Sequence, residues 1–577
     1  MRGADVLVEM LIQHGIKCIF GVPGDTSMAF HDALRLRASE IRHVLCRDER
    51  HAAYAADAYA RVTGTIGVVE VPSGGGALYV VPGLSEANVS NIPMLCISSE
   101  ISMSSEETNA LTDCNQEQLF AAVTKWNAKV KSGKTLPHLT RKALRLSCSG
   151  FSGVTALTMP ENVLREEYDG KLEEIYPAQG IGGFTAYRNE PSASDAAKLY
   201  AMLNAASKPL VLAGGGVHLS GAYDELADFL ERFQLPMISS VDGKGSISEY
   251  RDHVLGTVGA NGGSDEANQF AYQADLVIVL GCKMDNVTTF GKRLIQPHAK
   301  VVQVDLSEEI LGNNLRVDLP IMADIKALLK AVCQLAEPSV DYKAKHMEWN
   351  QNAQAKILEK RNRILAENQR EASRVIVARL IGTLEKYADE KTIFTGDAGN
   401  PTPYIASYIR CIAAGKNTIL PRGHGALGYA LPAAVGAQIG RPEGRVVALF
   451  GDGSFGMAMG ELETAKRLRL PIIFINLQND CYGWIKTIQR LYYKQNYYGV
   501  DFTEIDGLKI AEGFGIKGCN ITKNAEIEEA VQWAWSENQG PVFINVAIES
   551  IEEFVPPVCQ WEKDILLPDS DRKKLVY

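Results

Sequence analysis

The stretch VVALFGDGSFGMAMGELETAKRLRLPIIFINLQND, residues 446–480, decides the fold. It joins one apolar run to a second through a polar segment long enough for a helix. Apolar strands separated by helix-length segments indicate a parallel sheet with helices on both faces, because a crossover must return the chain to the same edge. Ligands bind such sheets at the carboxyl ends of the strands, so the polar residues after each apolar run are candidate site residues.

The same alternation continues in both directions from this stretch. It predicts the α/β class, with three doubly wound parallel-sheet domains at residues 1–175, 190–338 and 370–550 and an irregular tail at 551–577 that folds back over a cleft. We expect a linker near residues 176–183 and a charged connecting helix at 344–365.

Composition narrows the functional class. The chain has 577 residues, of which 46% are hydrophobic and 22% charged, as in ordinary globular domains. Its net charge of −10 provides no basic field for nucleic acid or an anionic membrane, so a small-molecule substrate is expected. No signal peptide or membrane span is recognisable, which predicts a cytoplasmic protein. The 11 cysteines form no C-x-x-C pair and are expected to be reduced and mostly buried.

Asp452 and Asn479 form the strongest candidate site. They lie 27 positions apart, each just after an apolar strand, with room between them for one helix at 459–468. Carboxylate and amide oxygens suit Mg²⁺, whereas the thiol of Cys481 does not, so Cys481 would contribute its backbone carbonyl. Gly453 would let the backbone approach a phosphate closely. The alternative is an ordinary turn in which Asp452 caps a helix.

Gly-Asp-Gly at 451–453, followed by Asn479, resembles the thiamine-diphosphate signature of the acetolactate synthase and pyruvate oxidase superfamily. The resemblance covers nearly the whole chain and includes the following segments: IFGVPGD (19–25), RDERHAAYAADAYARVTG (47–64), VPSGGGALYVVPGL (71–84), TGDAGN (395–400), GHGALGYALPAAVGA (423–437) and NDCYGWIKTIQ (479–489). It implies a pyrimidine-binding, a central and a diphosphate-binding domain, in that order.

The resemblance also implies thiamine diphosphate and Mg²⁺ as cofactors. The metal ligands would be Asp452, Asn479 and Cys481. The residues that it implies for cofactor binding are Pro23, Gly24, Ser73, Asn400, Gly425, Leu427, Gly451, Gly453, Ser454, Tyr482, Gly483 and Trp484. Among them, Leu427 would support the bent cofactor, and the carbonyl of Gly425 would accept a hydrogen bond from its aminopyrimidine.

Glu49 follows an apolar strand and begins an alanine-rich helix. The resemblance makes it the glutamate that shares a proton with the pyrimidine ring, and an apolar pocket would raise its pKa. Taken alone, it would be better explained as a charged residue in the first turn of a helix, and the second signature around Asp452 is what favours the catalytic role. Gln116 and Lys125 match further catalytic positions of the synthases, and each could instead be a surface or capping residue.

The implied reaction is decarboxylation of a pyruvate-like 2-keto acid and transfer of the acyl carbanion to an acceptor, as in acetolactate synthase. The alternatives are a pyruvate oxidase-like enzyme, a 2-keto acid decarboxylase and a catalytically silent member. Two departures from the synthase pattern, Ile488 and Asn115, put a strict biosynthetic role in doubt. The absence of a His-His dipeptide lowers the case for simple decarboxylation, and His424 is a candidate proton donor or a structural histidine.

The central block contains glycines at 214–216 and GCKMDN at 281–286, which resemble the FAD region of synthases and oxidases. Tight turns need glycine without any dinucleotide, and Lys283 replaces an arginine of that region, so FAD stays an open alternative. The resemblance further implies a homodimer or homotetramer with the cofactor at the subunit interface.

Overall fold

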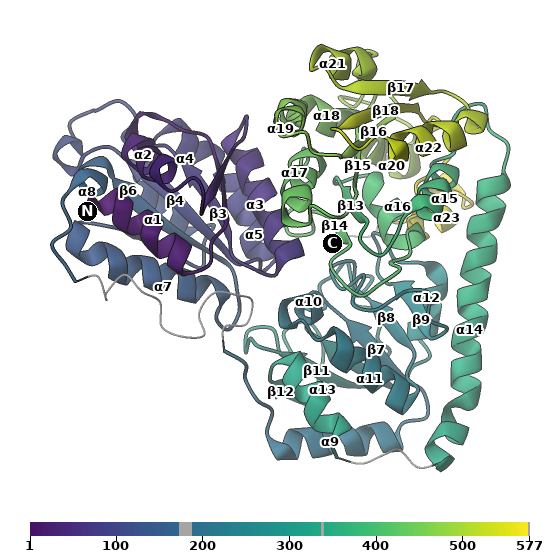
Figure 1. Ribbon diagram of the computed structural model, residues 1–577. Helices are drawn as coiled ribbons and strands as arrows, with labels where there is room; N and C mark the ends of the chain where they lie inside the picture. Colours follow the sequence, from purple (N-terminus) through teal and green to yellow (C-terminus); the bar gives the residue numbers. More distant parts are fainter. Residues whose placement is uncertain (172–186, 336–339, 575–577) are drawn as a thin grey trace. The chain divides into compact units, whose positions relative to one another are not determined.

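The computed structural model describes residues 1–171, 187–335 and 340–574, which form three parallel sheets (Figure 1). The chain divides into two compact units. Unit 1 consists of Met1–Tyr187, Pro421–Pro442 and Met457–Ile472. Unit 2 consists of Arg188–Leu420, Glu443–Gly456 and Ile473–Tyr577.

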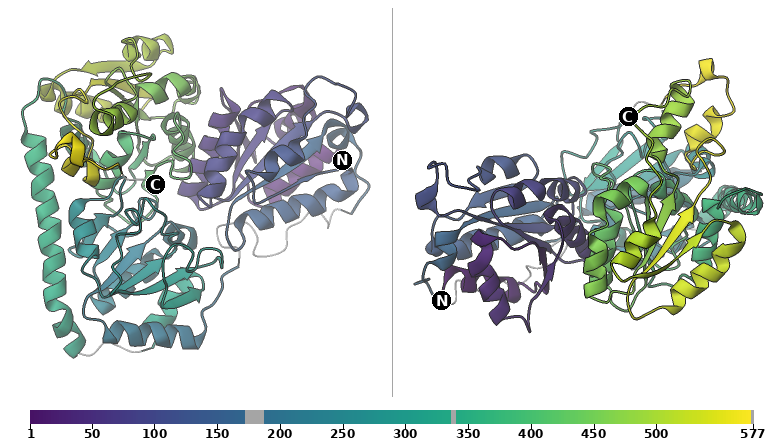
Figure 2. Two further views of the ribbon diagram at one scale, coloured as in Figure 1. Left: turned by 180° about the vertical axis from the view of Figure 1, so that it is seen from behind. Right: turned by 90° about the horizontal axis from the view of Figure 1, so that it is seen from above.

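Unit 1 contains a six-stranded sheet with the order β2-β1-β3-β4-β6-β5. Its strands are β1 (Cys18–Gly21), β2 (Arg42–Leu45), β3 (Gly67–Val71), β4 (Met94–Glu100), β5 (Trp126–Lys129) and β6 (Val154–Pro160). Its helices are α1 (Gly3–Gln13), α2 (Met28–Leu36), α3 (Glu49–Thr63), α4 (Gly75–Tyr79), α5 (Val81–Val89), α6 (Gln116–Ala121), α7 (Leu136–Cys148), α8 (Glu161–Arg165), α17 (Ala430–Gly440) and α19 (Glu461–Arg467). Helices cover both faces of the sheet (Figure 2).

Helix α17 packs closely on α3 within unit 1. Both helices are rich in alanine, and their facing residues are buried. A Cβ placed on Gly436 would lie 1.9 Å from the carbonyl oxygen of Ala55, so the two backbones meet where α17 has no side chain. At one side of this contact, Arg61 donates to buried Asp57 over 2.9 Å, and the Tyr429 hydroxyl donates to the same carboxylate.

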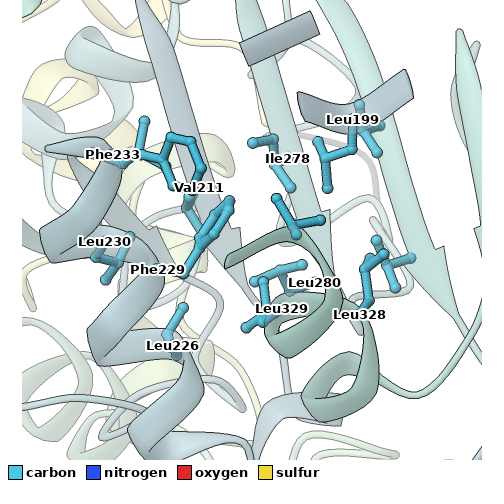
Figure 3. Close-up of a cluster of buried hydrophobic side chains, with 14 of the residues drawn as sticks. Leu199, Val211, Leu226, Phe229, Leu230, Phe233, Ile278, Leu280, Leu328 and Leu329 are labelled. Atoms are coloured by element: carbon cyan, nitrogen blue, oxygen red, sulfur yellow. The ribbon is translucent and has the colours of Figure 1, made fainter. Parts of the chain in front are cut away.

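The central sheet belongs to unit 2 and has the order β12-β11-β10-β7-β8-β9. Its strands are β7 (Pro209–Ala213), β8 (Met237–Ser239), β9 (Val254–Thr257), β10 (Leu276–Leu280), β11 (Lys300–Asp305) and β12 (Leu319–Met322). Its helices are α9 (Ala193–Ala205), α10 (Gly216–Ser220), α11 (Tyr223–Phe233), α12 (Asp265–Ala271) and α13 (Ile325–Cys333). Helices α9, α11 and α13 bury one core against this sheet, where Phe229 and Phe233 lie beside Val211 and Leu280 (Figure 3).

The third sheet, also in unit 2, has the order β14-β13-β15-β16-β18-β17. Its strands are β13 (Ile393–Gly396), β14 (Thr418–Ile419), β15 (Val446–Gly451), β16 (Ile473–Gln478), β17 (Lys517–Ile521) and β18 (Val542–Ala547). The helices of this part are α14 (Val340–Gln369), α15 (Val377–Tyr387), α16 (Pro401–Tyr408), α18 (Asp452–Ala458), α20 (Gly483–Tyr492), α21 (Gly507–Gly513), α22 (Ile527–Ser536) and α23 (Cys559–Asp564). Strands β15 and β16 are direct neighbours in parallel register, which brings their carboxyl ends together.

The predicted α/β class with three parallel sheets is confirmed, and the charged segment 344–365 lies within α14. The expected linker at 176–183 lies outside the described residues. The exact domain boundaries stay predictions. All 11 cysteines are free and most are buried, as expected. In the described part of the chain, no helix is both long and apolar enough to cross a membrane.

The helix expected at 459–468 is present as the short α19, while a second helix that the sequence did not predict, α18, begins at Asp452 itself. The expectation of a wholly irregular tail beyond residue 550 is wrong, because the tail contains α23. Trp561 of α23 packs on Trp484 with ring centroids 4.2 Å apart, and the Cys559 thiol donates to the carbonyl of Gly263. Apolar side chains spaced along the tail therefore hold it against unit 2.

Replacement of Gly436 by alanine should destabilise the protein by about 1–3 kcal/mol, because the added methyl group would overlap the backbone of α3. The free energy of unfolding can be followed by chemical denaturation with circular dichroism. Gly456→Ala is the matched control, since a Cβ there meets nothing within 4 Å. Equal stability of the two variants would contradict the tight helix contact.

Candidate active site

Asp452 ties together the carboxyl ends of β15 and β16. One oxygen of its carboxylate, Oδ2, accepts backbone N–H bonds from Asn479 over 2.9 Å and from Asp480 over 2.7 Å. Among the described residues, the other oxygen, Oδ1, accepts only a long hydrogen bond of 3.4 Å from the Asn476 side chain. Burial raises the pKa of Asp452, and the two backbone bonds oppose this effect. The arrangement leaves Oδ1 the better placed oxygen for a cation.

Two asparagines and two glycines lie beside this carboxylate. A Cβ on Gly483 would lie 2.6 Å from Nδ2 of Asn400 and 2.8 Å from Nδ2 of Asn479. The side-chain oxygen of Asn400 is buried and has no hydrogen-bond partner among the described residues. A Cβ on Gly453 would collide with the Tyr482 ring at 2.4 Å. The glycines therefore leave a cradle lined by polar atoms, one of which lacks a partner.

The loop after β16 has an unusual backbone. Asp480 has a φ of 55°, in the left-handed region, and its side chain accepts a 3.0 Å bond from Gln478. This turn places Cys481 opposite Asp501 and begins α20 at Gly483. Burial raises the pKa of the Cys481 thiol to about 12. The role of the Cys481 backbone carbonyl as a metal ligand stays a prediction.

The remaining predicted residues of unit 2 adjoin the same loops. Gly451 ends β15, and Ser454 is buried in α18. Trp484 approaches Gly399, which has a φ of 91°, and a Cβ added to this glycine would lie 3.6 Å from the Cβ of Trp484. The structure thus brings together the polar residues at the ends of β13, β15 and β16.

Glu49 begins α3 in unit 1, directly after the Asp48 cap, and its side chain is half-buried. Burial raises the pKa of the Glu49 carboxyl, with further contributions from the negative charges of Asp48 and Glu70. One of its oxygens, Oε1, lies 3.1 Å from where a Cβ of Gly76 would stand, so glycine makes room for the carboxyl. A carboxyl with a raised pKa can exchange a proton with a ligand nearer to neutral pH.

A chain of hydroxyl groups lies at the carboxyl ends of the strands of the first sheet, the end at which Glu49 follows β2. Thr26 is bonded to Ser73 over 3.2 Å and to Ser99 over 2.9 Å. Gln116 donates to the Ser99 carbonyl over 3.0 Å, while its own side-chain oxygen is buried without a partner in the described chain. Pro23 is followed by Gly24, and Gly24 packs against Pro72, the residue before Ser73. Thr26 and Ser99 therefore link Ser73 to Gln116.

Lys125 does not join this group. Lys125 lies before β5, and its backbone N–H donates to the carbonyl of Val154, which begins β6. This is the amino end of the strands, whereas Ser99 lies at the carboxyl end of β4. Its ammonium group donates to the carbonyls of Leu146 over 2.7 Å and Ser149 over 2.8 Å, which terminate α7. The geometry favours the helix-capping alternative over a catalytic role for Lys125.

The loop containing Gly425 and Leu427 belongs to unit 1, where Glu86 holds it. The buried Glu86 carboxylate accepts the backbone N–H groups of Gly423 and His424, the latter over 2.7 Å. Gly425 has a φ of 66°, and Leu427 is half-buried. His424 is exposed and its ring lies 2.8 Å from the Ser85 hydroxyl. Nothing in the sequence singles out Glu86, since an acidic residue in a short helix is typical of a surface position.

Backbone packing by itself requires two of the glycines in the central domain, Gly214 and Gly216. A Cβ on Gly214 would lie 2.1 Å from the carbonyl oxygen of Gly281, and one on Gly216 would lie 2.7 Å from the Cα of Gly281. The loops after β7 and β10 therefore meet backbone to backbone. FAD binding in this domain stays a prediction.

Comparison with known proteins assigns these features to a family. The family models of the thiamine pyrophosphate enzyme match the chain in order: the N-terminal binding domain at residues 1–119, the central domain at 196–332 and the C-terminal binding domain at 397–546. A relative from Escherichia coli (strain K12), the large subunit of acetolactate synthase isozyme 2, is 31% identical over 97% of each chain. The chain belongs to the thiamine pyrophosphate enzyme family.

Other relatives of this thiamine pyrophosphate enzyme have similar names. A probable acetolactate synthase large subunit from Methanococcus aeolicus is 29% identical over 96% of this chain and 94% of the relative. The isozyme 3 large subunit from Escherichia coli is 28% identical over 96% of both. The two matched binding domains imply thiamine diphosphate as the cofactor. Asn400, Asn479, Gly483 and the residues around Asp452 lie within the C-terminal match, and Glu49 lies within the N-terminal one.

Gly483→Ala should raise the thiamine diphosphate concentration needed for half-saturation by about tenfold or more, because the methyl group would displace the Asn400 and Asn479 side chains together. Cofactor titration followed by tryptophan fluorescence measures the effect. Gly513→Ala is the control, since a Cβ there meets nothing within 4 Å. Unchanged affinity in Gly483→Ala would show that this cradle does not hold the cofactor.

Proposed function

We propose that this thiamine pyrophosphate enzyme decarboxylates a pyruvate-like 2-keto acid and transfers the resulting acyl group to a second keto acid, as an acetolactate synthase-like carboligase. The observation that carries the proposal is the similarity to acetolactate synthase large subunits, which extends over 96–97% of the chain. Such coverage includes all three sheets rather than the cofactor-binding segments alone.

The residues at the ends of β15 and β16 fit a magnesium-bound diphosphate. Oδ1 of Asp452, the Asn479 amide oxygen and the Cys481 carbonyl are hard oxygen donors, which Mg²⁺ prefers. The cradle beside Gly483 offers the side-chain oxygen of Asn400, which has no partner among the described residues, as a further polar group. In this proposal Asp452, Asn479 and Cys481 hold the metal, and Gly451, Gly453, Ser454, Tyr482, Gly483 and Trp484 surround the diphosphate.

Glu49 would act on the other end of the cofactor. When bound, thiamine diphosphate supplies an electron sink for the carbanion that a 2-keto acid leaves after losing carbon dioxide. The raised pKa of Glu49 lets its carboxyl hold a proton beside the aminopyrimidine ring and exchange it there. Gly425 and Leu427, held by Glu86 through the preceding backbone, would orient that ring, and Pro23, Gly24 and Ser73 would line its pocket.

Gln116 is the further polar group of unit 1 proposed to contact the substrate, because its side-chain oxygen is buried without a described partner. We also infer that the active enzyme is a homo-oligomer, a homodimer or homotetramer with the cofactor at the subunit interface. Family membership supports this inference, and light scattering of the purified protein with bound cofactor tests it directly.

Incubation of the purified protein with pyruvate, Mg²⁺ and thiamine diphosphate tests the reaction. We expect carbon dioxide and acetolactate, identified by mass spectrometry. Acetaldehyde as the sole product would indicate a decarboxylase. Acetate or acetyl phosphate would indicate an oxidase, and any of these three outcomes would reject carboligation of pyruvate. Turnover of no keto acid in a broad panel would indicate a catalytically silent protein.

Asp452→Asn should raise the Mg²⁺ concentration needed for cofactor binding by about tenfold or more, because the amide keeps the size of the side chain and removes its charge. Asp480→Asn is the matched control: its carboxyl belongs to the adjoining loop, and asparagine tolerates its left-handed backbone. Equal magnesium dependence of the two variants, measured by cofactor titration, would exclude Asp452 as a ligand.

Glu49→Gln should lower the turnover number by about 10²–10⁴-fold while leaving thiamine diphosphate bound, because glutamine cannot exchange the proton. Glu117→Gln is the matched control, since Glu117 also lies in the first turn of a helix of this domain but is exposed. Steady-state kinetics with saturating cofactor measure both variants. An unchanged rate in Glu49→Gln would remove Glu49 from the catalytic role.

A further inference from the structure

Two histidines and a glutamate converge in the N-terminal domain, outside the proposed cofactor residues. Nε2 of His31 in α2 and Nε2 of His43 in β2 each lie 3.0 Å from Oε1 of Glu70 in β3. The two imidazole rings are 4.7 Å apart, and the three ligand atoms lie within 4.8 Å of one another. These residue types at this spacing can hold a metal ion.

The sheet register places these side chains together. Strand β1 lies between β2 and β3, with Ile19 opposite His43 and Gly21 opposite Glu70. Because side chains alternate along a strand, Ile19 and Gly21 share one face, and so do their partners. A Cβ on Gly21 would lie 2.4 Å from Oε1 of Glu70, so this glycine leaves the space in which the carboxylate reaches His43.

Hydrogen bonding within the cluster uses only one of the two carboxylate oxygens of Glu70. Its side chain is 1% exposed, and both histidines approach the same oxygen, Oε1. The second oxygen, Oε2, is buried and has no partner among the residues that the structure describes. A buried carboxylate oxygen without a partner destabilises the fold, because its lost hydration is not replaced. Three ligand atoms within 4.8 Å of one another, with one carboxylate oxygen left over, match a metal site better than a closed network of hydrogen bonds.

We propose that His31, His43 and Glu70 form a binding site for a divalent transition-metal ion such as zinc. Zinc–nitrogen bonds of about 2.0–2.1 Å at tetrahedral or square angles separate neighbouring ligand atoms by about 3 Å. The observed nitrogen–oxygen separations are 3.0 Å. Imidazole ligands favour zinc and its neighbours over magnesium, so the site would not compete for the diphosphate-bound Mg²⁺.

The geometry also leaves the bound ion accessible. Glu70 forms the buried end of the site, while the side chains of His31 and His43 are 20% and 17% exposed. Three protein ligands leave a coordination position that water or a small anion can fill from solvent. The site therefore has the composition of an open zinc centre rather than of a closed structural one.

Zinc binding to the protein loaded with Mg²⁺ and thiamine diphosphate tests the proposal. After incubation with zinc chloride and gel filtration, elemental analysis should find about one zinc ion per chain. His31→Gln and His43→Gln should each weaken zinc binding at least tenfold. His138→Gln, at an exposed histidine of the same domain, is the control and should bind zinc as the parent protein does. Failure of the parent protein to retain zinc, or retention by both cluster variants, would overturn the proposal.

A second measurement needs no substitution and remains decisive if the variants fold poorly. Diethyl pyrocarbonate modifies accessible imidazoles, and peptide mass spectrometry locates the modified residues. Zinc should protect His31 and His43 while leaving His138 equally modified. Equal modification of His31 and His43 with and without zinc would show that the cluster is a hydrogen-bonded triad and not a metal site.

Discussion

The polar loops at the carboxyl ends of the third sheet depend on the hydrogen bonds that the Asp452 carboxylate accepts. By accepting the N–H groups of Asn479 and Asp480, it holds the loop after β16 against the end of β15. That loop contains a left-handed residue and leads directly into α20. Without a fixed acceptor at its start, such a backbone would lose the geometry that brings Asn479 and Gly483 to Asn400.

Close approach of backbone, made possible by glycine, recurs throughout the chain. Gly436 lets α17 meet α3, Gly76 makes room for Glu49, and Gly21 does the same for Glu70. In each case a missing side chain leaves space either for another backbone or for a carboxylate. The surroundings of each buried carboxyl decide what it does. Burial raises the pKa of both Glu49 and Glu86, but Glu86 also accepts two backbone N–H bonds, which oppose this shift and hold a loop.

The strength of the sequence signal follows the burial of each strand. The long apolar runs of β10, β15 and β16 are unmistakable because both faces of these strands are buried. The edge strands β5 and β17 give no such signal, because β5 is only half-buried and β17 has exposed positions, so neither needs a continuous apolar run. The tail was misjudged for a related reason: its apolar side chains are spaced singly, and only α23 shows what they pack against.

The amino-acid sequence alone determined the parallel α/β class and the placement of Asp452 and Asn479 at neighbouring strand ends, because both follow from local apolar runs and their separation. Only the tertiary structure decided which distant side chains meet. It placed Gln116 on Ser99 and Lys125 at the opposite edge of the sheet. It also brought His31 and His43 to Glu70, a convergence that depends on strand order and register, which no local pattern encodes.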